Sequence, residues 1–187
     1  MAALWKQVAS LRQLAPVLTV DAMAEWIDST PGLDISSYRV ARSRSGELLG
    51  FFAVWDQRSF KQLNVIGYSP RMKAARAIFN LVSPVAGGAR MPGTGNSLNC
   101  VTIAHTCVPG DKPEVLRELL TSTHNELRRT GISFINIGLD TRDPLTSATD
   151  GFFAQPTDVN ACVTKSRAGI RCEPLDDAPI HYEISLV

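Results

Sequence analysis

The sequence predicts an α+β fold in which a mixed, largely antiparallel sheet is flanked by helices. Two runs rich in β-branched and aromatic residues, Tyr38–Arg42 and Leu48–Trp55, are separated by a short turn containing Gly46, which is typical of an antiparallel hairpin. Residues 98–140 read as strand, helix and strand, which predicts a right-handed parallel crossover at the core. With 187 residues, the chain is most simply one domain, 1–187.

Two amphipathic helices are expected within residues 1–35. The first spans residues 4–14 and stops before Pro16, with one face formed by Leu4, Val8, Leu11 and Leu14. Thr19 is the expected N-cap of the second, whose inward face would consist of Val20, Met23, Ala24 and Ile27.

Two longer helices are expected in the middle of the chain. Ser69 and Pro70 form an N-cap and first-turn pair, and the helix that follows has a stripe of Met72, Ala75, Phe79 and Val82. Asp111 is the expected cap of the other helix, and Glu114 would complete a capping box. Its predicted buried stripe consists of Val115, Leu116, Leu119, Leu120, Thr123 and Leu127.

The remaining elements are extended runs and one short helix. Residues 83–97, with four glycines and two prolines, are expected to form a loop. Asp143 and Pro144 begin a short helix that would run to about Phe153. The expected strands outside the hairpin are Leu63–Tyr68, Leu98–Val108, Ile132–Asp140, Val159–Lys165 and Ile180–Val187.

Charge is distributed unevenly along the chain. Between Gln57 and Gly110 there is no Asp or Glu, whereas six cations occur there: Arg58, Lys61, Arg71, Lys73, Arg76 and Arg90. A local field of one sign attracts the opposite sign, so an anionic small molecule is a predicted partner, with a solvated basic face as the alternative. The basic residues are too sparse for a nucleic-acid partner, and no apolar run is long enough to predict a membrane partner.

The four cysteines favour free thiols over a metal site or disulfides. Cys100, Cys107, Cys162 and Cys172 form no Cys-x-x-Cys pair, and no His stands at ligand spacing beside them, so no metal is expected. The first residues lack the pattern of a signal peptide, which predicts a cytoplasmic protein with reduced thiols.

The predicted order of elements resembles the GNAT N-acetyltransferase superfamily. The hairpin with Gly46-Glu-Leu-Leu-Gly50 is similar to the second and third strands of that family, and Leu98–Arg129 is similar to its acyl-coenzyme A motif of strand, loop and helix. Ile132–Phe153 resembles the strand and helix that follow, so the resemblance covers about Val40–Val187. The chain most resembles one lobe of the duplicated GNAT proteins. This implies transfer of an acyl group from coenzyme A to an amine, and a homodimer, because a lone lobe exposes the surface that its mate would cover.

The resemblance also implies a coenzyme site, but with a degenerate phosphate loop. Where the family has an Arg/Gln-x-x-Gly-x-Gly/Ala loop, this chain reads Pro109-Gly-Asp-Lys-Pro-Glu-Val115, in which only Gly110 and Lys112 suit a phosphate. Two acids and a proline without an amide hydrogen stand where backbone amides would bind the pyrophosphate. We therefore expect weak binding of acetyl-coenzyme A, with the amides near Cys107 and Val108 polarising the thioester oxygen.

Two residues are candidates for the general base that deprotonates the amine. His105 titrates near neutrality, and strand alternation places it on one face with Val101 and Ile103, although a core histidine is the alternative. Asp140 lies at the carboxyl end of the next strand, where open α/β sheets bind ligands. The tyrosine acid of the family has no counterpart within 143–153.

Candidate substrate-binding residues lie near the same strands. Trp55, Gln57 and Lys61 combine aromatic, amide and cationic groups where the chain leaves the hairpin, although a structural turn with Trp55 and Phe60 in the core is the alternative. Asn136 is the candidate on the later strand, and Arg142 follows the end of that strand. Gly138, inside the same strand, predicts close approach by a ligand or by backbone, with room for a packed helix as the alternative. Two functions remain open: an N-acyltransferase, or a non-catalytic GNAT-like small-molecule-binding or dimerisation module.

Overall fold

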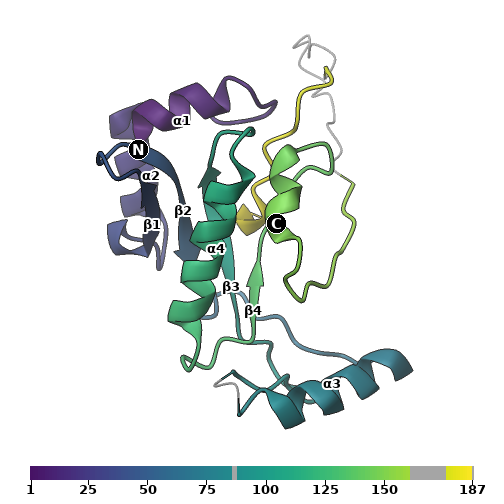
Figure 1. Ribbon diagram of the computed structural model, residues 1–187. Coiled ribbons are helices and arrows are strands. Elements are labelled where there is room, and N and C mark those ends of the chain that lie inside the picture. Colours follow the sequence, from purple (N-terminus) through teal and green to yellow (C-terminus); the bar gives the residue numbers. More distant parts are fainter. Residues whose placement is uncertain (86–87, 161–175, 187) are drawn as a thin grey trace, which may run out of the picture.

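A four-stranded mixed sheet forms the centre of the protein. The computed structural model describes residues 1–85, 88–160 and 176–186. In the order of the sheet the strands are β1 (Tyr38–Arg42), β2 (Leu48–Trp55), β3 (Cys100–Cys107) and β4 (Phe134–Asn136). The first two pairings are antiparallel and the third is parallel (Figure 1). The α+β class, the hairpin and the parallel crossover are therefore confirmed.

The hairpin has the predicted bounds because both strands consist largely of residues that suit a pleated surface. Its turn closes through a hydrogen bond from Ser43 N to Glu47 O of 2.8 Å. Gly46 adopts a φ of 89°, a left-handed conformation that glycine accepts without steric cost.

Two apolar clusters lie on opposite faces of the sheet, because successive side chains of a strand point to opposite sides. Phe51, Ala53 and Trp55 of β2 face α1 (Ala2–Ala9) and α2 (Val20–Ser29). Phe52 faces α4 (Pro113–Leu127) and η2 (Pro144–Thr149). The helices thus cover both faces, which leaves functional groups to be sought between layers or at the sheet edge (Figure 1).

The first helix is shorter than predicted. It ends at Ala9, Leu11 and Leu14 are 68% and 54% exposed, and the φ of Leu14 is 60°. The chain leaves the helix because Gln13 pairs with the C-terminal region: Gln13 N donates to Pro179 O (3.0 Å) and His181 N donates to Gln13 O (2.8 Å). Sequence periodicity alone could not reveal this distant partner.

The second helix agrees better with the prediction. The Thr19 hydroxyl caps it by accepting from Ala22 N, and Met23 and Ile27 are buried. Val20 is 71% exposed and Ala24 is also exposed, so their predicted inward placement is wrong.

Helix α4 carries the predicted buried stripe but not the predicted cap. Val115, Leu116, Leu119, Leu120 and Thr123 are buried, whereas Leu127 is half-buried. The N-cap position is Lys112, and no side chain caps the helix there. The predicted capping box of Asp111 and Glu114 is therefore wrong.

Several predicted strands are shorter or absent. Leu63–Tyr68 contributes only an isolated bridge between Asn64 and Ser97, and Ile132–Asp140 shortens to β4. Ile180–Val187 begins with a bridge to Gln13 and continues into η3 (Ile184–Leu186), so it is not a strand. Residues 161–165 of the strand predicted at 159–165 lie outside the described residues.

Helix α3 (Pro70–Val82) stands apart from the two layers, at the foot of the molecule (Figure 1). Ser69 caps it as predicted, accepting from Met72 N at 3.3 Å. The predicted inward stripe is only half-buried at Met72, Ala75 and Phe79, and Val82 is 57% exposed. In the part of the chain that the structure describes, no helix is long and apolar enough to cross a membrane.

Candidate functional site

A β-bulge in β3 changes the side of the sheet on which His105 lies. Phe51 pairs with Cys107 and Ala53 pairs with Ala104, so one residue of β2 opposes two residues of β3. His105 occupies the bulge with a φ of 53°. Its ring centroid lies 4.2 Å from that of Trp26 and 6.3 Å from that of Trp5, on the face covered by α1 and α2. The prediction that His105 shares a face with Ile103 is therefore wrong.

The imidazole of His105 is enclosed and already has a partner. It is 2% exposed, and Nδ1 forms a hydrogen bond with the Tyr38 hydroxyl. Burial lowers the pKa of His105, and the nearby carboxylate of Glu183 only partly opposes this effect. Burial and the same carboxylate raise the pKa of Tyr38. The histidine is therefore neutral at physiological pH, and substrate has no direct access to it in this conformation.

The C-terminal segment, residues 180–186, lies against β3 and its bulge (Figure 1). The backbone N–H of His105 donates to Glu183 Oε2 at 2.8 Å, and the Ser185 hydroxyl donates to Glu183 Oε1 at 2.5 Å. Gln57 Nε2 donates to Ser185 O at 2.8 Å, while Gln57 Oε1 accepts from the Thr102 hydroxyl at 3.1 Å. The segment thus occupies the polar groups that β3 presents beside the bulge.

The carboxylate of Glu183 is largely buried but ionised. Burial opposes its charge, but His181 together with hydrogen bonds from Ser185 and the His105 amide outweighs this and lowers the pKa of Glu183. His181 Nε2 is 3.8 Å from Glu183 Oε2 and has no hydrogen-bond partner among the described residues. Sequence reasoning missed this cluster, because its only local signal was the polar residues His181, Glu183 and Ser185 among the apolar ones of 180–187.

Asp140, the second predicted base, binds the same C-terminal segment. Its Oδ2 accepts from the backbone N–H of Ile180 at 2.7 Å and from Arg142 Nη2 at 2.8 Å. These contacts, the Arg142 hydrogen bond above all, lower the pKa of Asp140. A carboxylate stabilised in this way is a weak proton acceptor. The structure does not bring Asp140 and His105 together; instead, each holds a different part of residues 180–183.

Gly138 allows the C-terminal segment to approach the chain that follows β4. A Cβ atom at this position would lie 2.6 Å from the Tyr182 ring and 3.0 Å from Ile184 Cβ. The close approach that the glycine predicted is therefore made by the chain itself.

The other predicted substrate-binding residues contact neighbouring parts of the chain. Trp55 is 6% exposed and its Nε1 donates to Pro31 O at 2.9 Å, which supports the structural alternative for Trp55. Phe60 is 52% exposed, so its predicted place in the core is wrong. Asn136 opposes Thr102 across the parallel pair and lies beside the Cys100 thiol, whose pKa burial raises. Lys61 is half-buried, and Arg142 pairs with Asp140.

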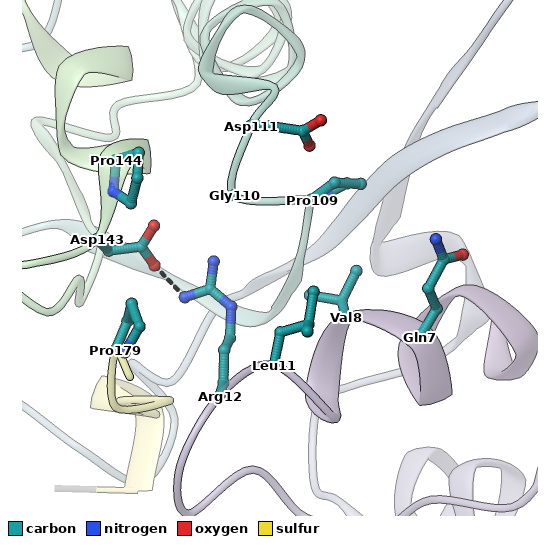
Figure 2. Close-up of a pocket in the computed structure, with 10 residues that line it drawn as sticks. All are labelled: Gln7, Val8, Leu11, Arg12, Pro109, Gly110, Asp111, Asp143, Pro144 and Pro179. Carbon is teal, nitrogen blue, oxygen red and sulfur yellow. Dashed lines mark hydrogen bonds and ion pairs between the residues drawn. The ribbon is translucent and has the colours of Figure 1, made fainter. Parts of the chain in front are cut away.

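The predicted coenzyme residues divide between the core and a surface hollow. Cys107 and Val108 are each 1% exposed, and burial raises the pKa of Cys107 to about 12. Gly110 lines a hollow of about 420 Å³ between the end of α1, the 109–111 loop and the start of η2 (Figure 2). Lys112, at the N-cap of α4, does not line this hollow.

The hollow at Gly110 has more acidic than basic groups. Its charged lining residues are Arg12, Asp111 and Asp143, and Figure 2 shows the Arg12 guanidinium directed at the Asp143 carboxylate. The Asp143 side chain is fully buried and also accepts from Leu145 N at 2.9 Å. Because Arg12 is paired with Asp143, its charge does not offset that of Asp111, and the acidic Asp111 disfavours a negatively charged pyrophosphate in the hollow.

No metal centre or disulfide is found within residues 1–85, 88–160 and 176–186. Those residues contain no group of three or more His, Cys, Asp or Glu that could hold a metal ion. Cys100 and Cys107 are free thiols. The other two predicted free thiols, Cys162 and Cys172, lie outside the described residues.

Comparisons with protein-family models, with curated proteins and with solved structures each found no match.

Proposed function

We propose that this protein is a GNAT-like module that does not transfer acyl groups and that acts by associating with a second copy of itself. The parallel pair of β3 and β4 with α4 between them, beside the antiparallel hairpin, supports the relationship to the GNAT superfamily. A fold can host many functions, so the site must support the functional part of the proposal.

The observation that carries the non-catalytic part of the proposal is the position of the C-terminal segment. β3 and β4 pair only over Cys100–Thr102 and Phe134–Asn136. Where β3 continues toward Cys107 without β4 beside it, Glu183 accepts a hydrogen bond from the His105 amide of the bulge, and Tyr182 and Ile184 pack beside Gly138. A substrate entering between the strands would have to displace these contacts, and the two candidate bases would lose partners that they already have.

Electrostatics at the phosphate loop supports the same proposal. A coenzyme A pyrophosphate carries negative charge. In the hollow at Gly110 the charge of Arg12 is balanced by Asp143, which leaves the carboxylate of Asp111. Like charges at short range oppose binding. This supports weak association with acetyl-coenzyme A.

Acyl transfer is the second candidate function, and one observation favours it. The bulge directs the His105 amide toward a carboxylate oxygen, and the same donor could bind a thioester oxygen if the C-terminal segment withdrew. In that case the segment would be an internal inhibitor, and weakening it would reveal coenzyme binding.

Calorimetric titration with acetyl-coenzyme A distinguishes the two functions. For the wild type we expect a dissociation constant above about 0.1 mM, and no release of coenzyme A in the presence of amines. Glu183→Ala frees the His105 amide, and Glu25→Ala, at an exposed position of α2, is the matched control. Low-micromolar binding by the wild type would refute the proposal. Tight binding gained only in Glu183→Ala would favour an inhibited acyltransferase.

A further inference from the structure

Helix α3 has an apolar face with no partner among the described residues. Its inner side contacts neighbouring loops: Asn80 pairs with the backbone of Met91, and Phe79 stacks with Phe153 at 6.5 Å. On the opposite side, a stripe at helical spacing faces solvent, and Ile78 and Leu81 are 66% and 77% exposed. We call this the outer stripe; it consists of Ala74, Ala77, Ile78 and Leu81.

We propose that the outer stripe is the contact through which two copies of the protein associate, with their α3 helices packed antiparallel across a twofold axis. This inference rests on the proposed function and identifies its surface. Contiguous exposed apolar residues with helical spacing mark interaction sites, and a twofold contact requires a surface that complements itself.

The order of side-chain sizes along the outer stripe provides that complementarity. Small residues occupy the N-terminal end of the stripe and large residues the C-terminal end. In an antiparallel pair centred between Ala77 and Ile78, Ala74 faces the partner's Leu81, and Ala77 faces the partner's Ile78. Large side chains then enter the space left by small ones, as close packing requires. A parallel pair would set large against large and leave the small residues unfilled.

The charges favour the same orientation. Arg71 and Lys73 are exposed at the start of the helix, and residues 77–89 contain no Lys or Arg. Antiparallel packing places these cations beside the partner's helix C-terminus, whose unpaired carbonyls carry partial negative charge. With a rise of about 1.5 Å per residue, equivalent cations of the two copies lie about 14 to 20 Å apart along the axis. That separation exceeds the screening length of about 8 Å in physiological salt.

Two further exposed apolar residues flank the helix in sequence. Ile66, four residues before Pro70, is 95% exposed, and Val85, three residues after Val82, is 90% exposed. A specific interface needs about 1,000 Å² of total buried area, which is more than one helix pair provides alone. We expect these flanking residues to contribute the remainder.

Light scattering coupled to size-exclusion chromatography tests the proposal. At micromolar concentration the wild type should have twice the chain mass of 20.3 kDa. Leu81→Glu should raise the dimer dissociation constant about 30-fold or more, since it places a charge against the partner's Ala74 within the apolar contact. Val17→Glu is the matched control, because Val17 is 92% exposed in the loop between α1 and α2. Circular dichroism should show both variants folded.

A size exchange tests the register. Ala74→Leu alone should weaken the dimer, because two large side chains then face each other. The double variant Ala74→Leu/Leu81→Ala exchanges the sizes and should restore the wild-type dissociation constant to within about threefold. If the double variant is weaker than either single variant, the antiparallel register is wrong.

The possible failures are distinguishable. A wild-type dimer unaffected by Leu81→Glu, or equally affected by Val17→Glu, overturns the outer stripe as the contact but leaves the proposed function standing. A wild-type monomer overturns both. A monomer that sediments with phosphatidylglycerol vesicles, but not after Leu81→Glu, would show that this face meets an anionic lipid surface and not a second copy.

Discussion

Replacing Gly138 with alanine should destabilise the protein, because the C-terminal segment leaves no room for a Cβ atom there. The added atom would lie 2.6 Å from Tyr182 Cδ1 and 3.0 Å from Ile184 Cβ, both closer than normal carbon contacts. Overpacking of this kind costs about 1–3 kcal/mol. The loss of backbone freedom in the unfolded chain returns about 0.5 kcal/mol. We expect a net loss of about 1.5 kcal/mol, which lowers Tm by about 3–6 °C.

Urea denaturation of matched variants isolates this effect. Gly67→Ala is the control, because a Cβ atom at Gly67 would have no neighbour within 4 Å. It should leave the free energy of unfolding unchanged or raise it by up to about 1 kcal/mol. In a Tyr182→Ala background, Gly138→Ala should cost about 1 kcal/mol less than in the wild type, because the closer contact is gone. Equal stability of Gly138→Ala and Gly67→Ala would refute the placement of Tyr182 against Gly138.

Three further predictions concern buried titratable groups. The pKa of His105 is lower in the folded protein than in the unfolded chain. Its contribution to stability is therefore complete above about pH 6.5 and is lost as the pH falls toward the folded pKa. His105→Asn, a residue that tolerates a positive φ, should flatten this part of a profile of Tm against pH. Arg12→Met leaves the buried carboxylate of Asp143 without its cation and should cost about 3 kcal/mol in urea denaturation, whereas Arg39→Met, at a more exposed pair, should cost at most about 1 kcal/mol. Cys107, with its raised pKa, should resist iodoacetamide at pH 8 in the native protein and react after unfolding, as peptide mass spectrometry would show.

The sequence predicted the elements whose formation depends on interactions between residues close together in the chain. Both hairpin strands have the predicted bounds, and the Thr19 and Ser69 hydroxyls cap α2 and α3 as expected. The buried stripe of α4 is also largely as predicted. In each case the deciding interactions lie within a few residues, or follow from the periodicity of one apolar face.

Long-range contacts account for the predictions that were wrong. The first helix stops early because Gln13 pairs with Pro179 and His181, more than 160 residues away in sequence. Alternation along β3 failed at His105 because the bulge introduces an extra residue that no local pattern revealed. The sequence singled out Asp140 and Gly138. Both contact the C-terminal segment, which was predicted as a strand. Its actual conformation depends on contacts with Gln13, Gln57, the bulge of β3 and residues 138–140.

Hydrogen exchange of the His105 amide tests most directly the claim that residues 180–186 occupy the site beside the bulge. In the wild type this amide should exchange slowly, because its hydrogen bonds to the buried Glu183 carboxylate. Glu183→Ala should accelerate its exchange by about 10-fold or more, while the amides of the β1–β2 hairpin remain protected. Rapid exchange of the His105 amide in the wild type, or exchange that Glu183→Ala leaves unchanged, would contradict the account.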